Sequence, residues 1–396
     1  MRVIELSHEY PPFIFGGVGT FVRNLAYGLS RRGVEVTVVS GVPVRRLVSR
    51  PTSRRYREGP GVTVLRFPYP SIPPRHTTFQ VFNYKNLQRI VKSIDPDVIH
   101  GHSGSAFPFL LSARSLAPAI VTFHTSPKME RDMSLYSSTR GGSFRDFWTY
   151  VVGYPLWLCT FRKELENSDK GVAVSNALML ELLGEMGSSY SEKITTVHNG
   201  VDIEALDRES ADAGDDVAEC DDKVLFAGRL FWRKGALHIV ELACLLEKMG
   251  SKFKIVVHGE GPLYWRMKRT IDQLRLHNIT MKGFTTRADL MRSMKSSRFV
   301  IVPSLYEACP MILLESMCLG KIPVMFSLPY SLELTENGRY GILGTSVRDM
   351  VNKLTTVRKQ VDLTTFGQKI SDFARKNYDI KNISLRYIDL YRKMCE

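Results

Sequence analysis

The chain contains 396 residues, which is more than one ordinary hydrophobic core serves, so we expect two domains of roughly 200 residues each. With 44% hydrophobic and 24% charged residues, the composition is that of a globular protein and excludes a fibrous or disordered chain. The net charge of +14 is concentrated in residues 1–180, which contain 23 Lys and Arg against 12 Asp and Glu.

The cysteines indicate a reducing compartment. There are six, at positions 159, 220, 244, 309, 318 and 395, and no two form a Cys-x-x-Cys pair. This scatter argues against a zinc site and a disulfide framework. The first residues run directly into a strand pattern, so we expect no signal peptide. We therefore expect a cytoplasmic protein, with a peripheral position on the inner face of the membrane as the alternative.

The chain begins with a strand, a helix and a second strand, the unit of a parallel doubly wound sheet. The expected strands are 3–7 and 34–39, and apolar residues at four-residue spacing predict a helix from about 19 to 32. The loop after the first strand carries Gly16 and Gly17. It lacks the G-x-G-x-x-G spacing and lies about ten residues from its strand, so it is not a dinucleotide fingerprint.

Polar residues accompany a short buried strand at 97–102. Asp95 and Asp97 match an Asp-x-Asp metal-binding pattern, but they lie where a helix ends and a strand begins, away from any phosphate loop. We expect His100 and His102 to point to opposite faces of this strand and therefore not to chelate one ion. The sequence thus predicts no metal site.

His124 ends another buried strand, 119–124, at the carboxyl end where α/β sheets place their ligands. A single histidine at such a position is either a structural residue with satisfied hydrogen bonds or a ligand-binding residue. The strand pattern alone does not decide between these roles. Further strands at 170–175 and 193–197 are expected to complete the first domain.

Two features of the first half of the chain suggest contact with an anionic partner or a membrane surface. A run of arginines suggests an anionic partner, such as phospholipid head groups, a lipid diphosphate or nucleic acid, or else a solvated loop. The most apolar stretch, 147–159, is too short to span a bilayer and is interrupted by Gly153 and Pro155. It is either a core helix or a patch that enters a membrane surface. The arginines of the run are Arg45, Arg46, Arg50, Arg54, Arg55 and Arg57.

Residues 203–222 are acidic and small, a composition typical of a surface connection, and place the domain boundary near residue 200. A second alternation of strands and helices begins at residue 223. The chain therefore has the pattern of two doubly wound α/β domains. The strands of the second domain are expected at 223–227, 253–257, 279–282, 299–302 and 322–326.

The stretch 305–320 is expected to contain a short buried helix that starts at Pro310 and stops at Gly320. Its residues are apolar or small on every side except at Glu315, a carboxylate that needs hydroxyl or cationic partners in an interior. Glu307 precedes the helix, whose first amides form a place for phosphate. Two carboxylates beside an anion site suit a sugar nucleotide, although a structural and an exposed glutamate remain the alternative.

Six short motifs are spread over nearly the whole chain. The most specific are Glu307-x7-Glu315 and Gly228-Arg-x4-Lys-Gly235. The other four are Glu9-Tyr-Pro-Pro with Gly16-Gly-Val-Gly19, Thr122-Phe-His124, His198-Asn-Gly-Val-Asp202 and Gly259-Glu-Gly-Pro262. In motifs and in their order, the chain resembles the retaining glycosyltransferases of family 4 (glycosyl transferases group 1), which have the GT-B fold.

The resemblance implies two Rossmann-like domains facing across a cleft. Residues 1–200 would bind the acceptor and residues 201–377 the nucleotide sugar, with a helix at about 378–396 packed back on the first domain. It implies a hexosyltransferase that moves a hexose from a nucleotide diphosphate sugar to a lipid-linked or saccharide acceptor. The resemblance implies no metal ion, because protein cations would take its place. It also implies no other cofactor and no nucleic acid.

The resemblance also assigns roles to single residues. Arg229 and Lys234 would hold the diphosphate, Glu315 the ribose and Glu307 the transferred sugar, beside which His124 would lie. The implied catalytic residues are His124, Arg229, Lys234 and Glu307. The implied donor-binding residues are Gly17, Arg229, Lys234, Gly259, Pro310, Met311, Ile312 and Glu315, and the acceptor side has Gly16, Gly17 and His124.

The sequence departs from the family at 327–333, where Ser-Leu-Pro-Tyr-Ser-Leu-Glu replaces a glycine-rich turn near the donor. Neither the sugar nor the nucleotide base is therefore readable from the sequence. Two alternatives remain open. One is a soluble glucan or disaccharide synthase of the same fold, and the other is a non-catalytic membrane-surface protein with a GT-B shell.

Overall fold

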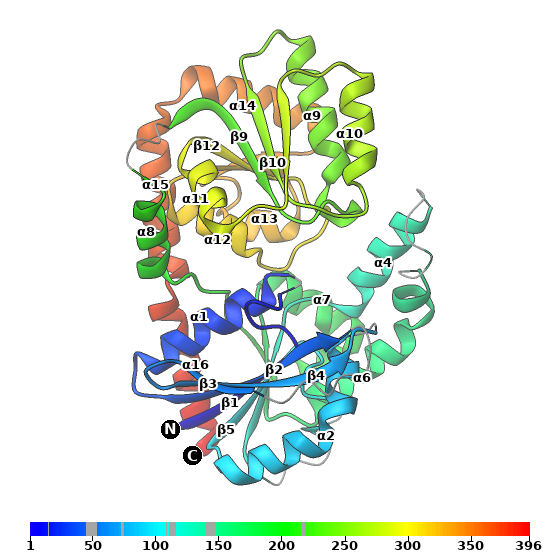
Figure 1. Cartoon of the computed structure of the whole chain (residues 1–396), viewed down its shortest axis with the longest axis vertical. Helices are drawn as coiled ribbons and strands as arrows, with labels where there is room; N and C mark the ends of the chain where they lie inside the picture. Colours follow the sequence, from blue (N-terminus) through cyan, green and yellow to red (C-terminus); the bar gives the residue numbers. More distant parts are fainter. Residues whose placement is uncertain are drawn as a thin grey trace. The chain divides into compact units, whose positions relative to one another are not determined.

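A computed structural model of the chain describes residues 1–14, 16–44, 54–72, 75–107, 109–110, 116–139, 144, 147–214 and 219–396. The chain divides into two compact units (Figure 1). Unit 1 contains Met1–Gly200 and Ile380–Glu396, and unit 2 contains Val201–Asp379. Each unit is built on its own sheet, so the two are described separately.

Unit 1 has an eight-stranded sheet in the order β3-β4-β2-β1-β5-β6-β7-β8, parallel except for β3, which pairs antiparallel with β4. β1, β5 and β6 are almost wholly buried, as expected for parallel strands covered on both faces. The strands are β1 (Arg2–Ser7), β2 (Glu35–Val44), β3 (Arg54–Gly59), β4 (Val62–Pro70), β5 (Val98–His102), β6 (Ala119–Phe123), β7 (Lys170–Ala173) and β8 (Ile194–Thr196).

The helices of unit 1 include one from the far end of the chain. α16 (Ile380–Cys395) packs against α1 (Val18–Ser30), and its buried Tyr387 and Tyr391 reach polar groups of the sheet. The last residues of the chain are therefore part of unit 1. Its other helices are α2 (Arg75–Ile94), α4 (Pro127–Ser138), the π-helix η1 (Phe147–Val152), α6 (Tyr154–Glu166), α7 (Asn176–Met186) and the 3₁₀ turn η2 (Ser188–Tyr190).

Unit 2 has a six-stranded parallel sheet in the order β11-β10-β9-β12-β13-β14. Its strands are β9 (Cys220–Ala227), β10 (Lys254–His258), β11 (Ile279–Gly283), β12 (Ser297–Val302), β13 (Ile322–Phe326) and β14 (Ile342–Gly344). Its helices are α8 (Ile203–Asp212), the 3₁₀ turn η3 (Trp232–Lys234), α9 (Ala236–Lys248), α10 (Tyr264–Gln273), α11 (Arg287–Lys295), α12 (Met311–Cys318), α13 (Pro329–Leu334), α14 (Val347–Gln360) and α15 (Leu363–Tyr378).

Some local features differ from the sequence-based expectations. The apolar stretch 147–159 is not one helix, because Gly153 separates η1 from α6. Of the arginine run, Arg54, Arg55 and Arg57 are exposed on β3, whereas 45–53 lies outside the described residues. The acidic connection contains α8, which buries Leu206. Among the described helices, none is both long enough and apolar enough to cross a membrane.

Candidate active site

Two loops at the carboxyl ends of neighbouring strands in unit 2 are joined to each other. One follows β9 and carries Arg229 and Lys234, and the other follows β12 and carries Glu307. The amide of Leu305 donates a hydrogen bond to the carbonyl oxygen of Arg233 at 2.9 Å. Since β9 and β12 pair in the sheet, both loops emerge at the same edge, where α/β sheets bind ligands.

Glycines allow these loops to approach so closely. Gly235 has φ +68, and a Cβ atom there would overlap the carbonyl oxygen of Pro303 in the other loop. Gly259 has φ +139, and a Cβ there would overlap the carbonyl oxygen of Gly228. Both positions favour glycine for backbone conformation and for space. The glycines of these two motifs thus hold three loops together at one edge of the sheet.

The Lys234 ammonium donates a hydrogen bond to Oε1 of Glu307, an oxygen that also accepts one from Oγ of Ser304 at 2.7 Å. Glu307 is buried, which by itself raises the pKa of its carboxyl. The charges of Lys234 and Arg233 and the two hydrogen bonds outweigh burial and hold this pKa below its usual value. Glu307 is therefore an ionised carboxylate bound to a cation, not the exposed glutamate of the alternative interpretation.

Glu315 lies in α12, with 7% of its side chain exposed, and is paired with Arg287 at the start of α11. Nη1 of Arg287 donates to Oε2 of Glu315 at 2.7 Å, and its Nε donates to Glu209 at 2.9 Å. The negative charge of Glu315 is the main reason why the pKa of Arg287 lies above its usual value. The buried carboxylate thus has the cationic partner that its position requires.

The start of α12 lies just after Glu307. Pro310 is its N-cap, and Met311 and Ile312 are its first residues, whose amides precede the first hydrogen-bonded turn. Such a helix end carries partial positive charge and suits an anion. Arg229 is exposed in the neighbouring loop, with its guanidinium 5.8 Å from the ring centre of Phe231. Lys234 and the start of α12 therefore lie close to Glu307, and Arg229 belongs to the same loop as Lys234.

In unit 1, the glycine loop lies at the carboxyl edge of the sheet. The amide of Gly16 donates to Oε2 of Glu9 at 3.0 Å, and Gly17 is the N-cap of α1. His124 follows β6, and its ring meets that of Phe21 from α1 edge-on at 5.3 Å. Burial lowers the pKa of His124 to about 3, so the ring is neutral near pH 7.

The expectation that His100 and His102 point to opposite faces is wrong. Residues two apart in a strand share a face, and these two rings lie 4.2 Å apart. Nδ1 of His102 lies 3.3 Å from Nε2 of His124, so the structure brings His102 next to a predicted site residue. Asp95 and Asp97 instead interact with Arg2, at the opposite end of the strands.

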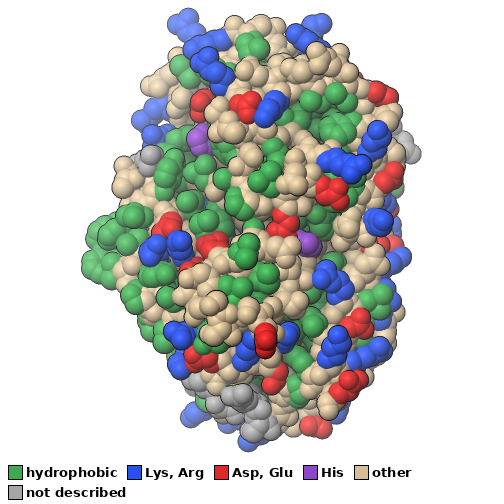
Figure 2. Space-filling view, turned by 180° about the vertical axis from the view of Figure 1, so that it is seen from behind, with side chains coloured by type: hydrophobic (Ala, Val, Ile, Leu, Met, Phe, Trp, Pro, Cys, Tyr) green, Lys and Arg blue, Asp and Glu red, His purple; other side chains and the backbone are tan. Residues whose placement is uncertain are grey.

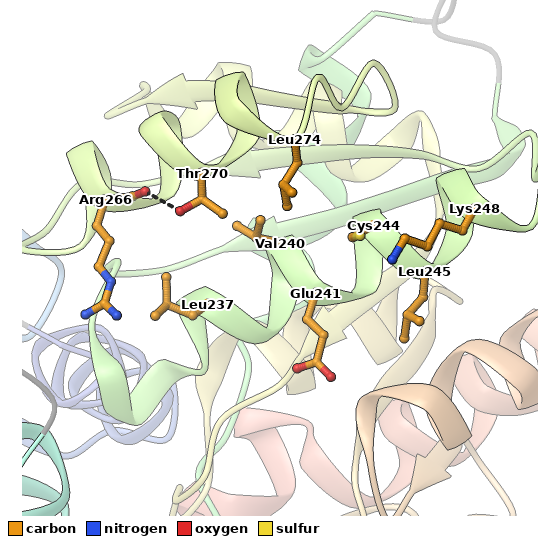
Figure 3. Close-up of a pocket in the computed structure, with 9 residues that line it drawn as sticks. All are labelled: Leu237, Val240, Glu241, Cys244, Leu245, Lys248, Arg266, Thr270 and Leu274. Carbon is orange, nitrogen blue, oxygen red and sulfur yellow. Dashed lines mark hydrogen bonds between the residues drawn. The ribbon is translucent and has the colours of Figure 1, made fainter.

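A hollow between α9 and α10 is separate from these groups (Figure 3). Its wall is mostly apolar, with Arg266 and Lys248 at its ends, and Thr270 donates a hydrogen bond to the carbonyl oxygen of Arg266 at 2.9 Å. None of the site residues predicted from the sequence lines it. The lining residues are Leu237, Val240, Glu241, Cys244, Leu245, Lys248, Arg266, Thr270 and Leu274.

Sequence reasoning did not identify Arg287 or His102 as site residues. Arg287 follows Thr286, whose side chain caps α11, so its position at a helix start was readable in principle. Its pairing with Glu315, 28 residues away, depends on the sheet order. His102 was dismissed through the mistaken assignment of faces.

Comparisons with known proteins agree with the architecture of two parallel-sheet units. The family model of glycosyltransferase family 4 matches residues 15–205, and that of glycosyl transferases group 1 matches residues 207–361. An uncharacterized glycosyltransferase of Methanocaldococcus jannaschii, MJ1607, is 24% identical, over 99% of this chain and 94% of its own. Together these matches extend through both units.

Two solved structures have a similar fold. Sucrose-phosphate synthase from Thermosynechococcus elongatus matches with a TM-score of 0.75 and 17% identity, covering 99% of this chain and 98% of its own. Alr3699/HepE from Anabaena, in complex with UDP and glucose, matches with a TM-score of 0.66 and 15% identity, covering 99% and 100%. With its two parallel-sheet domains and its matches to both models, the chain belongs to the family 4, group 1 glycosyltransferases of the GT-B fold.

Proposed function

We propose that this protein is a retaining hexosyltransferase that moves a hexose from a nucleotide diphosphate sugar to a lipid-linked or saccharide acceptor without a metal ion. The observation that carries the proposal is the Lys234–Glu307 pair beside Arg229 and the start of α12. The structure of Alr3699/HepE with UDP and glucose supports a donor of this class.

The pair suggests how the donor is received. Diphosphate at the start of α12 would compete with Glu307 for Lys234, since both ligands are anionic. Once Lys234 turns to the diphosphate, Glu307 can accept hydrogen bonds from the hydroxyls of the transferred sugar. The same carboxylate thus keeps the cation in place before the donor arrives and holds the sugar afterwards.

Departure of the diphosphate builds negative charge on the leaving oxygen. Arg229, Lys234 and the first amides of α12 are cationic or dipolar groups of the kind that stabilise such charge. Because these groups can do the work of a divalent cation, the proposed reaction needs none. On the retaining path, the acceptor would enter on the side from which the diphosphate leaves.

The lipid-linked acceptor is supported by the surface of unit 1. Figure 2 shows hydrophobic side chains gathered on a projecting part of the molecule. In unit 1, α4, η1 and α6 pack together and carry several large exposed apolar side chains, while β3 carries exposed arginines. Exposed apolar side chains can anchor a protein at a membrane surface, and exposed arginines attract anionic head groups. The exposed apolar residues of these elements are Leu135, Trp148, Val152 and Leu156, and Phe144, between α4 and η1 in the sequence, is also exposed.

A panel of nucleotide sugars tests the donor assignment. Thermal unfolding should shift upward with the true donor, because a ligand that binds only the folded state stabilises it. Transfer to lipid-linked and to soluble acceptors should then be compared with the same donor. No thermal shift and no hydrolysis or transfer with any donor would instead favour the non-catalytic membrane-surface protein, and transfer only to soluble sugars would favour the glucan or disaccharide synthase.

A further inference from the structure

Beneath His124, unit 1 contains a carboxyl group with no described partner for either oxygen. Glu5, in the middle of β1, is completely buried, and neither Oε1 nor Oε2 has a hydrogen-bond partner among the described residues. The same holds for Nε2 of His102, which lies 3.9 Å from Oε2 of Glu5. Two unpaired buried polar atoms that face each other call for an explanation.

These groups form a line that ends at His124. Nδ1 of His102 lies 3.3 Å from Nε2 of His124, so His102 has one ring nitrogen toward each neighbour. Glu5 and His102 have no exposed surface, whereas His124 is only half-buried. The line therefore runs from the closed interior to the carboxyl edge of the sheet.

The 3.9 Å separation of Glu5 and His102 exceeds a hydrogen bond by about 1 Å. A small side-chain rotation of Glu5 would close it, and no hydrogen bond among the described residues opposes that rotation. Leaving both groups unpaired in the interior is costly, which favours closure.

Burial also determines where the protons lie. It raises the pKa of Glu5 well above its usual value, and it lowers the pKa of His102. Near pH 7, Glu5 is then a neutral acid that can donate to Nε2 of His102. His102 in turn carries its proton on Nδ1, and this Nδ1–H group donates a hydrogen bond to Nε2 of His124.

We propose that Glu5 and His102 are positioning residues for His124: through this chain of hydrogen bonds they keep the proton of His124 on Nδ1. The Nδ1–H group, on the side of the ring away from His102, is then a donor for a sugar hydroxyl. That use of His124 rests on the proposed function, whereas the tautomer itself does not.

A cation held by Glu5, His100 and His102 is the competing explanation, because one ligand atom from each lies within 4.8 Å of the others. His100, however, is hydrogen-bonded through both ring nitrogens, to Tyr391 and to Thr122, each at 2.8 Å. A metal ion would have to displace one of these bonds. The hydrogen-bond chain displaces none.

Nitrogen-15 NMR of histidine-labelled protein tests the proposal, because it reports each ring's tautomer without any substrate. In the wild type at pH 7, we expect the Nδ1–H tautomer of both His102 and His124. An Nε2–H tautomer of either ring, or one equivalent of metal found by elemental analysis of the purified protein, would overturn it. Because this readout needs no activity, it is independent of whether the protein transfers a sugar.

Two variants at one position separate positioning from packing. Glu5→Leu removes the donor and should leave His124 as a mixture of tautomers, with kcat reduced about five- to tenfold, the scale of one neutral hydrogen bond. Glu5→Gln keeps a donor, an amide N–H, and should retain both the tautomer and kcat. An unchanged tautomer in Glu5→Leu would contradict the proposal, and if that variant does not fold, the wild-type spectra still decide.

Tyr391→Phe is the matched control. It removes the buried hydrogen bond to His100, in the same polar layer, without touching His102 or His124. It should lower the melting temperature and leave the tautomer of His124 unchanged. A change of tautomer in this control equal to that in Glu5→Leu would show that the effect is general loosening of the core, against the proposal.

Discussion

Arg287 donates a hydrogen bond from Nη1 to Oε2 of Glu315 at 2.7 Å, which ties the start of α11 to the middle of the buried helix α12. The carboxylate lies in the interior, whereas 42% of the arginine side chain is exposed. The pair gives the buried carboxylate a cationic partner that stays in contact with water over part of its surface, which lowers the desolvation cost relative to a wholly buried pair.

Arg287→Gln should destabilise unit 2. The variant leaves Glu315 buried without its cation, and we expect the free energy of unfolding to fall by about 1–2 kcal/mol, less than for a wholly buried pair because water already screens Arg287. Urea unfolding of the variant and wild type measures this difference. Arg292→Gln is the control on the same helix, since its partner Asp289 is exposed. If both variants lose the same free energy of unfolding, the pair of Arg287 with Glu315 stabilises unit 2 no more than an exposed ion pair on the same helix.

The two glutamates should separate nucleotide binding from transfer. Glu315→Gln should weaken binding of the nucleoside diphosphate, because Glu315 is assigned to the ribose hydroxyls. Glu307→Gln should not weaken that binding, because it removes the carboxylate that competes with the diphosphate for Lys234, and it should lower transfer, because Glu307 is assigned to the sugar. Calorimetry with the nucleoside diphosphate makes the comparison, and a similar loss of affinity in both variants would refute this division of roles.

The cations of the β9–α9 loop should matter for turnover. Lys234→Ala or Arg229→Ala should reduce kcat by about two to three orders of magnitude, as expected when one positioned charge stabiliser is lost. Both side chains are partly or largely exposed, so the fold should survive. Lys268→Ala, a change at the exposed surface of α10, is the control and should leave kcat unaltered. Near-normal turnover of either loop variant with the true donor means that its assignment is wrong.

Transfer should persist in excess chelator. Protein cations and the start of α12 supply the positive charge that a divalent ion would otherwise bring, so we expect wild-type rates in EDTA. The rate is measured after dialysis against chelator and again after addition of Mg²⁺ or Mn²⁺. Loss of activity in EDTA that either ion restores would count against metal independence.

Unit 1 should bind anionic vesicles reversibly. Each basic side chain near such a surface contributes up to about 1 kcal/mol, and salt should weaken the binding because it screens these charges. Co-sedimentation with phosphatidylserine-containing liposomes at low and high salt measures it. The variant with Arg45, Arg46, Arg54 and Arg55 changed to Ser should bind less, and so should Phe144→Ser with Leu156→Ser. No sedimentation of wild type at low salt would exclude the membrane and leave the transferase proposal intact.

The local sequence determined the elements around the candidate site. Pro310 and Gly320 bound α12 within two residues, because N-terminal proline and C-terminal glycine act through their own backbone conformations. The buried position of Glu315 followed from its apolar neighbours along the same helix. Most strands were likewise predictable, since a short apolar run between helical segments is typical of a buried strand in a parallel sheet.

Only the tertiary structure decided which side chains meet. Lys234 with Glu307, Arg287 with Glu315 and His102 with His124 each join segments that are 22 or more residues apart. Such pairings depend on which strands are neighbours in the sheet, and no local pattern encodes that order. The antiparallel edge strand β3 was not foreseen for the same reason: its mostly charged residues are typical of a loop, and only the pairing with β4 makes them a strand. The local sequence thus determines which helix, strand or loop carries each polar side chain, and the long-range packing determines which side chain it pairs with.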